Sequence, residues 1–150
     1  MNNVDSARKH TVMHKKDFDL WNSQKKKIEG IATRVFFKER QVWFCSLGTN
    51  VGDEEDGKGP NHERPILIIK KFNNSIFLGL PLSTKIKDNN KFYYKINVKD
   101  VEVSAMISQI RLLDAKRLKR KVCFIEQDEF ENLKNEIISI NFKNRTDPIK

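Results

Sequence analysis

Four apolar runs decide the fold expected of this chain: QVWFCSL (41–47), RPILIIKKF (64–72), SIFLGLPLS (75–83) and KFYYKINV (91–98). Each is rich in β-branched and aromatic residues, which favour strands. Asn73 and Asn74 predict a tight hairpin turn, and residues 88–90 (Asp-Asn-Asn) predict a second one. Because closure leaves no exposed edges, short strands joined in this way predict a mostly β fold, an antiparallel sheet curled into a small barrel.

The pattern continues toward the carboxyl end. Two more strands are expected at SAMISQIRLL (104–113) and RKVCFIE (120–126), with a brief helical turn over 114–118 between them. A terminal helix is expected from Asp128, which is spaced with Glu131 as a capping box. Its apolar stripe is formed by Phe130, Leu133, Ile137 and Ile140.

Before the strands, Phe18, Trp21 and Ile28 recur at helical spacing, which predicts an amphipathic helix over 17–29 that Gly30 ends in a left-handed cap. The chain therefore divides into four predicted parts: a disordered arm (1–14), an N-terminal helical extension (15–39), the main domain (40–142) and a frayed tail (143–150).

Composition points to a polyanionic partner. Lys and Arg total 29 against 20 Asp and Glu, for a formal net charge of +9. A basic surface of this kind attracts nucleic acid, although many basic proteins are merely soluble. The sequence has no apolar run of membrane-span length and no signal-peptide core, so we expect a cytoplasmic protein with no membrane association. Cys45 and Cys123 lie in apolar runs and are expected to be free thiols.

The loop GDEEDGKGPNHER (52–64) is the most unusual segment. Its glycine and lysine spacing nearly matches a phosphate-binding loop, but the acidic residues 53–56 would repel phosphate. It also half-matches a calcium loop, yet Gly52 offers no carboxylate at the first ligand position. We therefore predict no metal site. A mobile loop that closes over a site and a merely solvated acidic loop both remain open.

Several linked motifs carry a resemblance: VWFCSLGTNVG (42–52), ERPILII (63–69), PLSTK (81–85) and SAMISQIRLLDAKRL (104–118). In this order they resemble the PemK/MazF family of type II toxins. The resemblance implies a small SH3-like barrel of the PemK/MazF/CcdB type with helical decorations. It also implies a homodimer that is silenced by a cognate antitoxin, with which it binds DNA.

The activity implied by the resemblance is that of an mRNA interferase, an endoribonuclease that needs no metal or other cofactor. It would cleave single-stranded RNA, including mRNA, by attack of a 2′-hydroxyl, leaving a 2′,3′-cyclic phosphate and a 5′-hydroxyl end. Arg64 and Ser83 match the family's catalytic pair. Glu54, Gln109 and Arg111 also match family positions, and together with Thr84 they are the expected supporting or substrate-binding residues.

Two features at the site depart from this simple correspondence. Glu55 stands where many family members have glutamine, and Ser108 replaces a common glutamate. His62 lies two residues from Arg64, and histidine is the side chain that most often serves as a general base, so His62 is a candidate for that role, although a loop histidine is more often solvated. Arg64 could instead serve only to pair with the acidic loop.

Two other functions remain possible for the same fold. One is a non-enzymatic toxin that binds a topoisomerase, and the other is an RNA-binding barrel without cleavage. Relatives that poison gyrase act through an apolar carboxy-terminal tail containing tryptophan, whereas this sequence ends TDPIK (146–150). Cleavage of RNA by the purified protein would distinguish the endoribonuclease from both of these alternatives.

Overall fold

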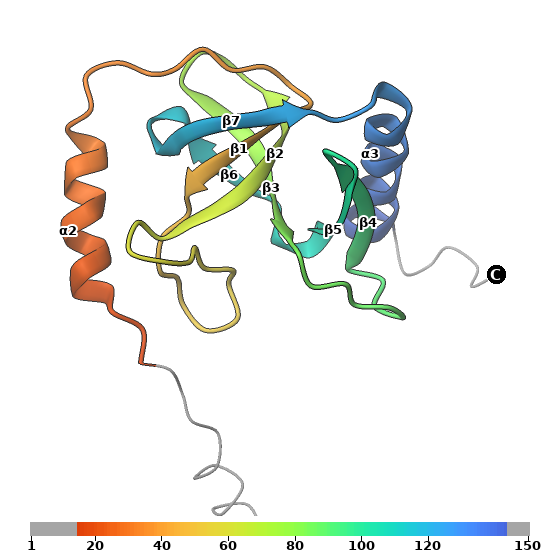
Figure 1. Cartoon of the computed structure of the whole chain (residues 1–150), viewed down its shortest axis with the longest axis horizontal. Helices are drawn as coiled ribbons and strands as arrows, with labels where there is room; N and C mark the ends of the chain where they lie inside the picture. Colours follow the sequence, from red (N-terminus) through yellow and green to blue (C-terminus); the bar gives the residue numbers. More distant parts are fainter. Residues whose placement is uncertain (1–14, 144–150) are drawn as a thin grey trace, which may run out of the picture.

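The computed structural model describes residues 15–143, which form an antiparallel β structure with two α-helices (Figure 1). The strands are β1 (Gln41–Ser46), β2 (Glu63–Lys71), β3 (Ile76–Ser83), β4 (Tyr93–Val98), β5 (Val101–Met106), β6 (Arg111–Asp114) and β7 (Leu118–Phe124). The helices are α2 (Phe18–Glu29) and α3 (Gln127–Phe142), and single 3-10 turns occupy Ile107–Gln109 and Ala115–Arg117. Among the described residues, no helix is long and apolar enough to cross a membrane.

The strand order is β4-β5-β3-β2-β1-β7, and β6 pairs with β3 beside this path. The mostly β prediction is confirmed, but the predicted closed barrel is not, because the end strands β4 and β7 do not pair with each other. β3 changes partner along its length, from β6 near Phe77 to β5 at Leu82. The edge strand β7 carries exposed Lys119 and Lys121, and charged side chains protect an edge without closure.

Two sequence predictions between β3 and β7 were wrong. The run 104–113 is not one strand, because β5 ends at Met106 and a 3-10 turn separates it from β6. The turn at 88–90 does not close a hairpin, since β4 pairs with β5 rather than with β3. The turn of the β4–β5 hairpin lies at Lys99 and Asp100, which have φ of 49° and 64°, the left-handed values of a tight two-residue turn.

The apolar run of β2 is continuous because both faces of this strand are buried. Leu67 and Ile69 belong to a core that α3 covers with its buried stripe of Phe130, Leu133 and Ile137. Ile66 and Ile68 belong to a second core on the opposite face, with Trp43 and Phe77. A short, uninterrupted apolar run is what a strand between two cores requires. The stripe predicted for the terminal helix is confirmed.

The helix ends differ from the predictions. Gly30 has φ of −73° and is right-handed, so the predicted left-handed cap is wrong. α3 begins at Gln127 with Glu126 as its N-cap, and no side chain caps it, so the predicted capping box is wrong as well. The arm predicted for 1–14 lies outside the described residues, as does most of the tail predicted for 143–150.

Candidate active site

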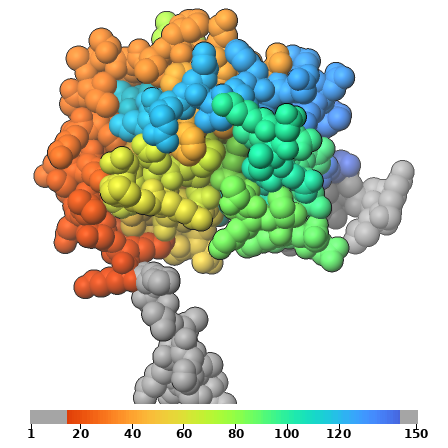
Figure 2. Space-filling model, in the orientation of Figure 1, coloured from red at the N-terminus to blue at the C-terminus, as the bar shows by residue number. Residues whose placement is uncertain are grey.

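A groove of about 370 Å³ lies across β1, β2 and β3, and it contains both predicted catalytic residues. Its walls are largely apolar, and its lining includes Phe44, Lys58, Glu63, Arg64, Pro65, Leu82, Ser83, Thr84 and Val122. Figure 2 shows the loop that ends at β2 in yellow, beside the green segment that follows β3, with β7 in blue above them.

Strand register brings Arg64 and Ser83 together although 19 positions separate them. In the β2–β3 pair, Ile66 lies opposite Pro81. Continuing this antiparallel register by two residues places Arg64 opposite Ser83. A hydrogen bond also joins the two strands here, since Arg64 Nη1 donates to the carbonyl oxygen of Leu82, the residue before Ser83, at 3.1 Å.

The guanidinium of Arg64 is held on three sides. Its Nε donates to the carbonyl oxygen of Asp56 at 2.7 Å, and its Nη2 lies 2.5 Å from Oε1 of Glu55. The Arg64 side chain is only 7% exposed. A buried arginine with every nitrogen engaged is fixed in orientation, so it is pre-organised to meet an anion in the groove.

Ser83 lies at the end of β3, where its Oγ accepts a hydrogen bond from the amide of Lys85 at 3.2 Å. The residue paired with it on β5 is Ser104. The Ser104 hydroxyl is buried and has no hydrogen-bond partner among the described residues. The sequence did not indicate this pairing, because nothing in it shows which strand lies beside β3.

The structure does not bring His62 into this groove. Its Nδ1 lies 2.6 Å from Oε1 of Gln24, and its ring lies 5.5 Å from that of Trp21, both residues of α2. His62 has φ of 51° and is buried in the hairpin where Lys58 pairs with Glu63. The proposed general base is thus packed beneath the N-terminal helix.

The other predicted residues gather at the acidic loop. Gln109 donates from Nε2 to the carbonyl oxygen of Asp53 at 2.9 Å and accepts from the amide of Glu55 at 3.1 Å. Glu54 accepts from the amide of Val51 at 2.9 Å. Glu54, Gln109 and Arg111 line a separate hollow of about 420 Å³. Glu54 and Gln109 therefore fix the loop, while only Arg64, Ser83 and Thr84 of the predicted site line the groove.

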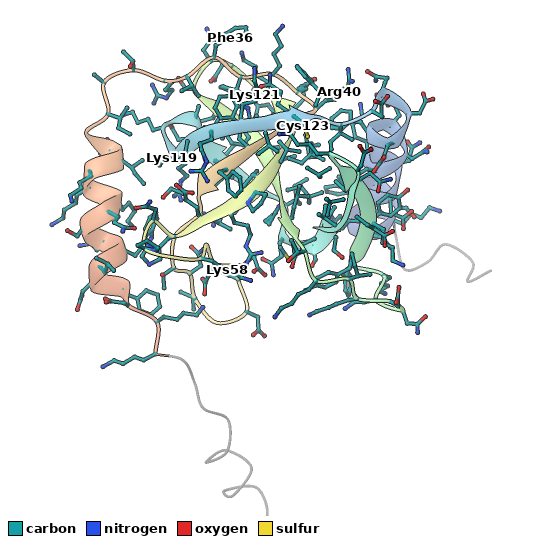
Figure 3. The ribbon with its side chains drawn as sticks, viewed as in Figure 1. Phe36, Arg40, Lys58, Lys119, Lys121 and Cys123 are labelled. Atoms are coloured by element: carbon teal, nitrogen blue, oxygen red, sulfur yellow. The ribbon has the colours of Figure 1, made fainter. Side chains whose placement is uncertain are left out.

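A basic strip runs from the groove along β7. It consists of exposed Lys58, Lys119, Arg120 and Lys121, together with half-buried Arg40 (Figure 3). Arg120 lies 4.3 Å above the ring of Phe44, a residue of the groove wall. The guanidinium of Arg40 lies 5.7 Å from the ring centre of Phe124. No group of three potential metal ligands occurs among residues 15–143.

Comparison with known proteins gives one family match. Residues 38–140 match the model of PemK-like, MazF-like toxins of type II toxin–antitoxin systems. A search of curated proteins finds no matching sequence.

Solved structures show the same fold at low sequence identity. An endoribonuclease in complex with its cognate antitoxin from a mycobacterial species has a TM-score of 0.56 and 12% identity, over 73% of this chain and 99% of that one. MazF from Deinococcus radiodurans has a TM-score of 0.54 and 13% identity, over 71% of this chain and 96% of that one. The MazE–MazF complex of the same organism has a TM-score of 0.50 and 12% identity, over 73% of this chain and 100% of that one.

Proposed function

Because the chain belongs to the family of PemK-like, MazF-like toxins of type II toxin–antitoxin systems, we propose that it is an endoribonuclease that cleaves single-stranded RNA without a metal. The single observation that carries this proposal is the shared groove of Arg64 and Ser83. The two residues offer a fixed cation and a hydroxyl at one place, and both can act on a phosphate.

The proposed reaction is an internal transfer within the RNA. The ribose 2′-oxygen forms a bond to the adjacent phosphorus, and the bond to the 5′-oxygen breaks. The 2′-hydroxyl loses one proton and the leaving 5′-oxygen gains one, so the products are a 2′,3′-cyclic phosphate and a 5′-hydroxyl. Negative charge grows on the phosphorane oxygens, where Arg64 and the Ser83 hydroxyl stabilise the transition state more than the substrate.

Substrate entry requires an exchange at Arg64. In the free protein the Glu55 carboxylate occupies the position beside Nη2 that a phosphate oxygen would take. An incoming phosphodiester must displace this carboxylate, since one cation that is already paired attracts a second anion only weakly. The Glu55 side chain therefore has to turn away from Arg64 when RNA binds, while the Asp56 carbonyl can keep its bond to Arg64 Nε.

The basic strip supplies the longer-range attraction in this proposal. Lys119, Arg120 and Lys121 follow one another on β7, and Arg120 reaches back over the groove wall at Phe44. Flanking phosphates of an RNA strand seated at Arg64 would meet these charges. Arg120 also pairs with Glu63 at 3.2 Å, so its charge is partly neutralised and the two lysines carry most of the attraction.

We further propose a homodimer in the cytoplasm, inhibited by a cognate antitoxin with which it binds DNA. Two proteins of similar fold that are bound to their antitoxins support a protein inhibitor. Phe142 and Ile138 on α3 are 71% and 58% exposed, which supports an interface on that helix. Glu54, Thr84, Gln109 and Arg111 remain proposed supporting residues, and the placement of His62 argues against its role as general base.

The decisive test is incubation of purified protein with a mixed RNA pool in excess EDTA, followed by sequencing of the RNA ends. Specific cuts with cyclic phosphate and 5′-hydroxyl ends are expected. Intact RNA that is nevertheless bound would indicate a binding protein without cleavage. Intact RNA with no binding would favour the toxin that acts on a topoisomerase.

A further inference from the structure

Residues 15–37 precede the family match at 38–140, yet they contact the loop that holds Arg64. Figure 1 shows α2, in orange, beside the loop between β1 and β2. The side chains of the extension that make these contacts have no part in the proposed reaction.

Trp21 anchors the helix at the start of this loop. Its side chain is 5% exposed, although it lies on a helix that is otherwise largely exposed. A Cβ atom on Gly48 would lie 2.2 Å from Trp21 Cε2, so the indole packs directly on the loop backbone. The amide of Gly48 donates to the carbonyl oxygen of His62 at 3.1 Å. Trp21 therefore contacts the point where the loop begins and ends.

Two polar side chains of the extension hold the loop between these points. Gln24 bonds His62 through Oε1 and donates from Nε2 to the carbonyl oxygen of Pro60. Lys16 donates from Nζ to the carbonyl oxygens of Asn50, at 2.6 Å, and Gly52, at 2.8 Å. The extension thus binds both halves of the loop.

The contact that reaches the groove passes through Asp56. Lys16 Nζ lies 3.1 Å from Asp56 Oδ2, and Asp56 Oδ1 accepts from the amide of Asn50 at 2.6 Å. The carbonyl oxygen of the same Asp56 accepts from Arg64 Nε at 2.7 Å. Asp56 alone therefore connects Lys16 to Arg64, through an ion pair on one side and a hydrogen bond on the other. Lys16 also neutralises one of four consecutive acidic side chains, whose mutual repulsion opposes this loop conformation.

We propose that Lys16 is a positioning residue of the proposed active site and that α2 supports it. Together they hold the loop in the conformation in which the Asp56 carbonyl orients Arg64 toward the groove. This inference rests on the proposed function. Without Lys16, the Asp56 carboxylate repels its acidic neighbours, the loop leaves this conformation, and Arg64 loses the alignment on which transition-state stabilisation depends.

The first arm of the test compares Lys16→Gln with Lys26→Gln, which removes the same charge from an exposed position on α2. Lys16→Gln is expected to lower kcat by about tenfold while KM changes less than about twofold, because misplacement of a catalytic group acts on the chemical step. Lys26→Gln should leave kcat unchanged, and Lys16→Arg should restore most of it. Equal kcat values for Lys16→Gln and wild type would overturn the inference.

The second arm does not depend on RNA cleavage, so it separates failure of this inference from failure of the proposed function. It measures the proton resonance of Arg64 Nε–H, identified by its loss in Arg64→Ala. In the wild type and in Lys26→Gln this proton should exchange slowly with water, because it is bonded to Asp56 and buried. Lys16→Gln should accelerate the exchange at least about tenfold. Identical exchange in Lys16→Gln and the wild type would overturn the positioning role, whether or not the protein cuts RNA.

Discussion

The Glu55 carboxylate lies 2.5 Å from Nη2 of Arg64, and the two side chains are 25% and 7% exposed. Arg64 lines the groove that also contains Ser83, whereas Glu55 lines the neighbouring hollow with Glu54 and Gln109. In the free protein, the Arg64 guanidinium that would bind phosphate is therefore already paired with the Glu55 carboxylate. The free energy of RNA binding therefore includes the cost of separating the two groups.

Glu55→Gln should strengthen RNA binding. A neutral amide competes less well for Arg64, so KM should fall about fivefold, which corresponds to about 1 kcal/mol. We expect kcat to stay the same, and steady-state kinetics on a short RNA would measure both. Asp53→Asn is the matched control, because it removes the same charge from an exposed position of the same loop. A fall in kcat for Glu55→Gln would instead show that Glu55 takes the proton from the 2′-hydroxyl.

Arg64→Ala should lose most of the activity. Removing one pre-organised donor lowers turnover by about 10² to 10³ fold. Arg64→Lys should be nearly as slow, because an ammonium cannot bond Asp56, Leu82 and a phosphate with fixed geometry. Cleavage rates in EDTA, with circular dichroism to verify folding, provide the measurement. Normal cleavage by folded Arg64→Ala would remove Arg64 from the mechanism.

Ser83→Ala should slow cleavage less than Arg64→Ala, by about tenfold, because the neighbouring Thr84 also lines the groove and offers a hydroxyl. The fold loss of rate in the double variant Ser83→Ala with Thr84→Val should exceed the product of the losses in the two single variants. Single-turnover rates at saturating RNA would test this. Multiplicative effects would mean that Thr84 does not replace Ser83.

Lys119→Gln combined with Lys121→Gln should raise KM for RNA and reduce its dependence on salt. Loss of two phosphate contacts lowers the slope of log affinity against log salt by about 1.4 for a single strand. Binding measured between about 50 and 200 mM salt would show this. The control variant, Lys70→Gln with Lys99→Gln, removes two exposed lysines outside the basic strip. Equal slopes in both double variants would exclude β7 from the RNA path.

Cys45 should be unreactive in the folded protein. Burial raises the pKa of this thiol from 9.0 to about 12, so the thiolate is scarce at neutral pH. Because the folded state raises this pKa, its contribution to stability is complete below about pH 9 and is lost as the pH rises toward 12. Thiol titration at pH 8 should label half-buried Cys123 first, and Cys45 only after unfolding. Rapid labelling of Cys45 under native conditions would contradict its burial.

The sequence by itself determined most of the strands, the family and the two residues that share the groove. Apolar runs such as 64–72 and 75–83 identify strands because side-chain chemistry and turn residues are local properties. The stripe on α3 was equally readable, since its helical period lies within 16 residues. Arg64 and Ser83 came from motif order, and the hairpin at Asn73 then sets the β2–β3 register that places them together.

Only the tertiary structure decided which loop residues face Arg64, where His62 lies and whether the sheet closes. These depend on contacts between distant segments: Lys16 with Asp56, Gln24 with His62, and β3 with both β5 and β6. A sequence pattern records which residues prefer burial or charge, but it does not record which partner is nearby. For this reason the sequence left the pairing of Arg64 with the acidic loop undecided. The structure shows that Arg64 pairs with Glu55, in the loop between β1 and β2 that packs against α2.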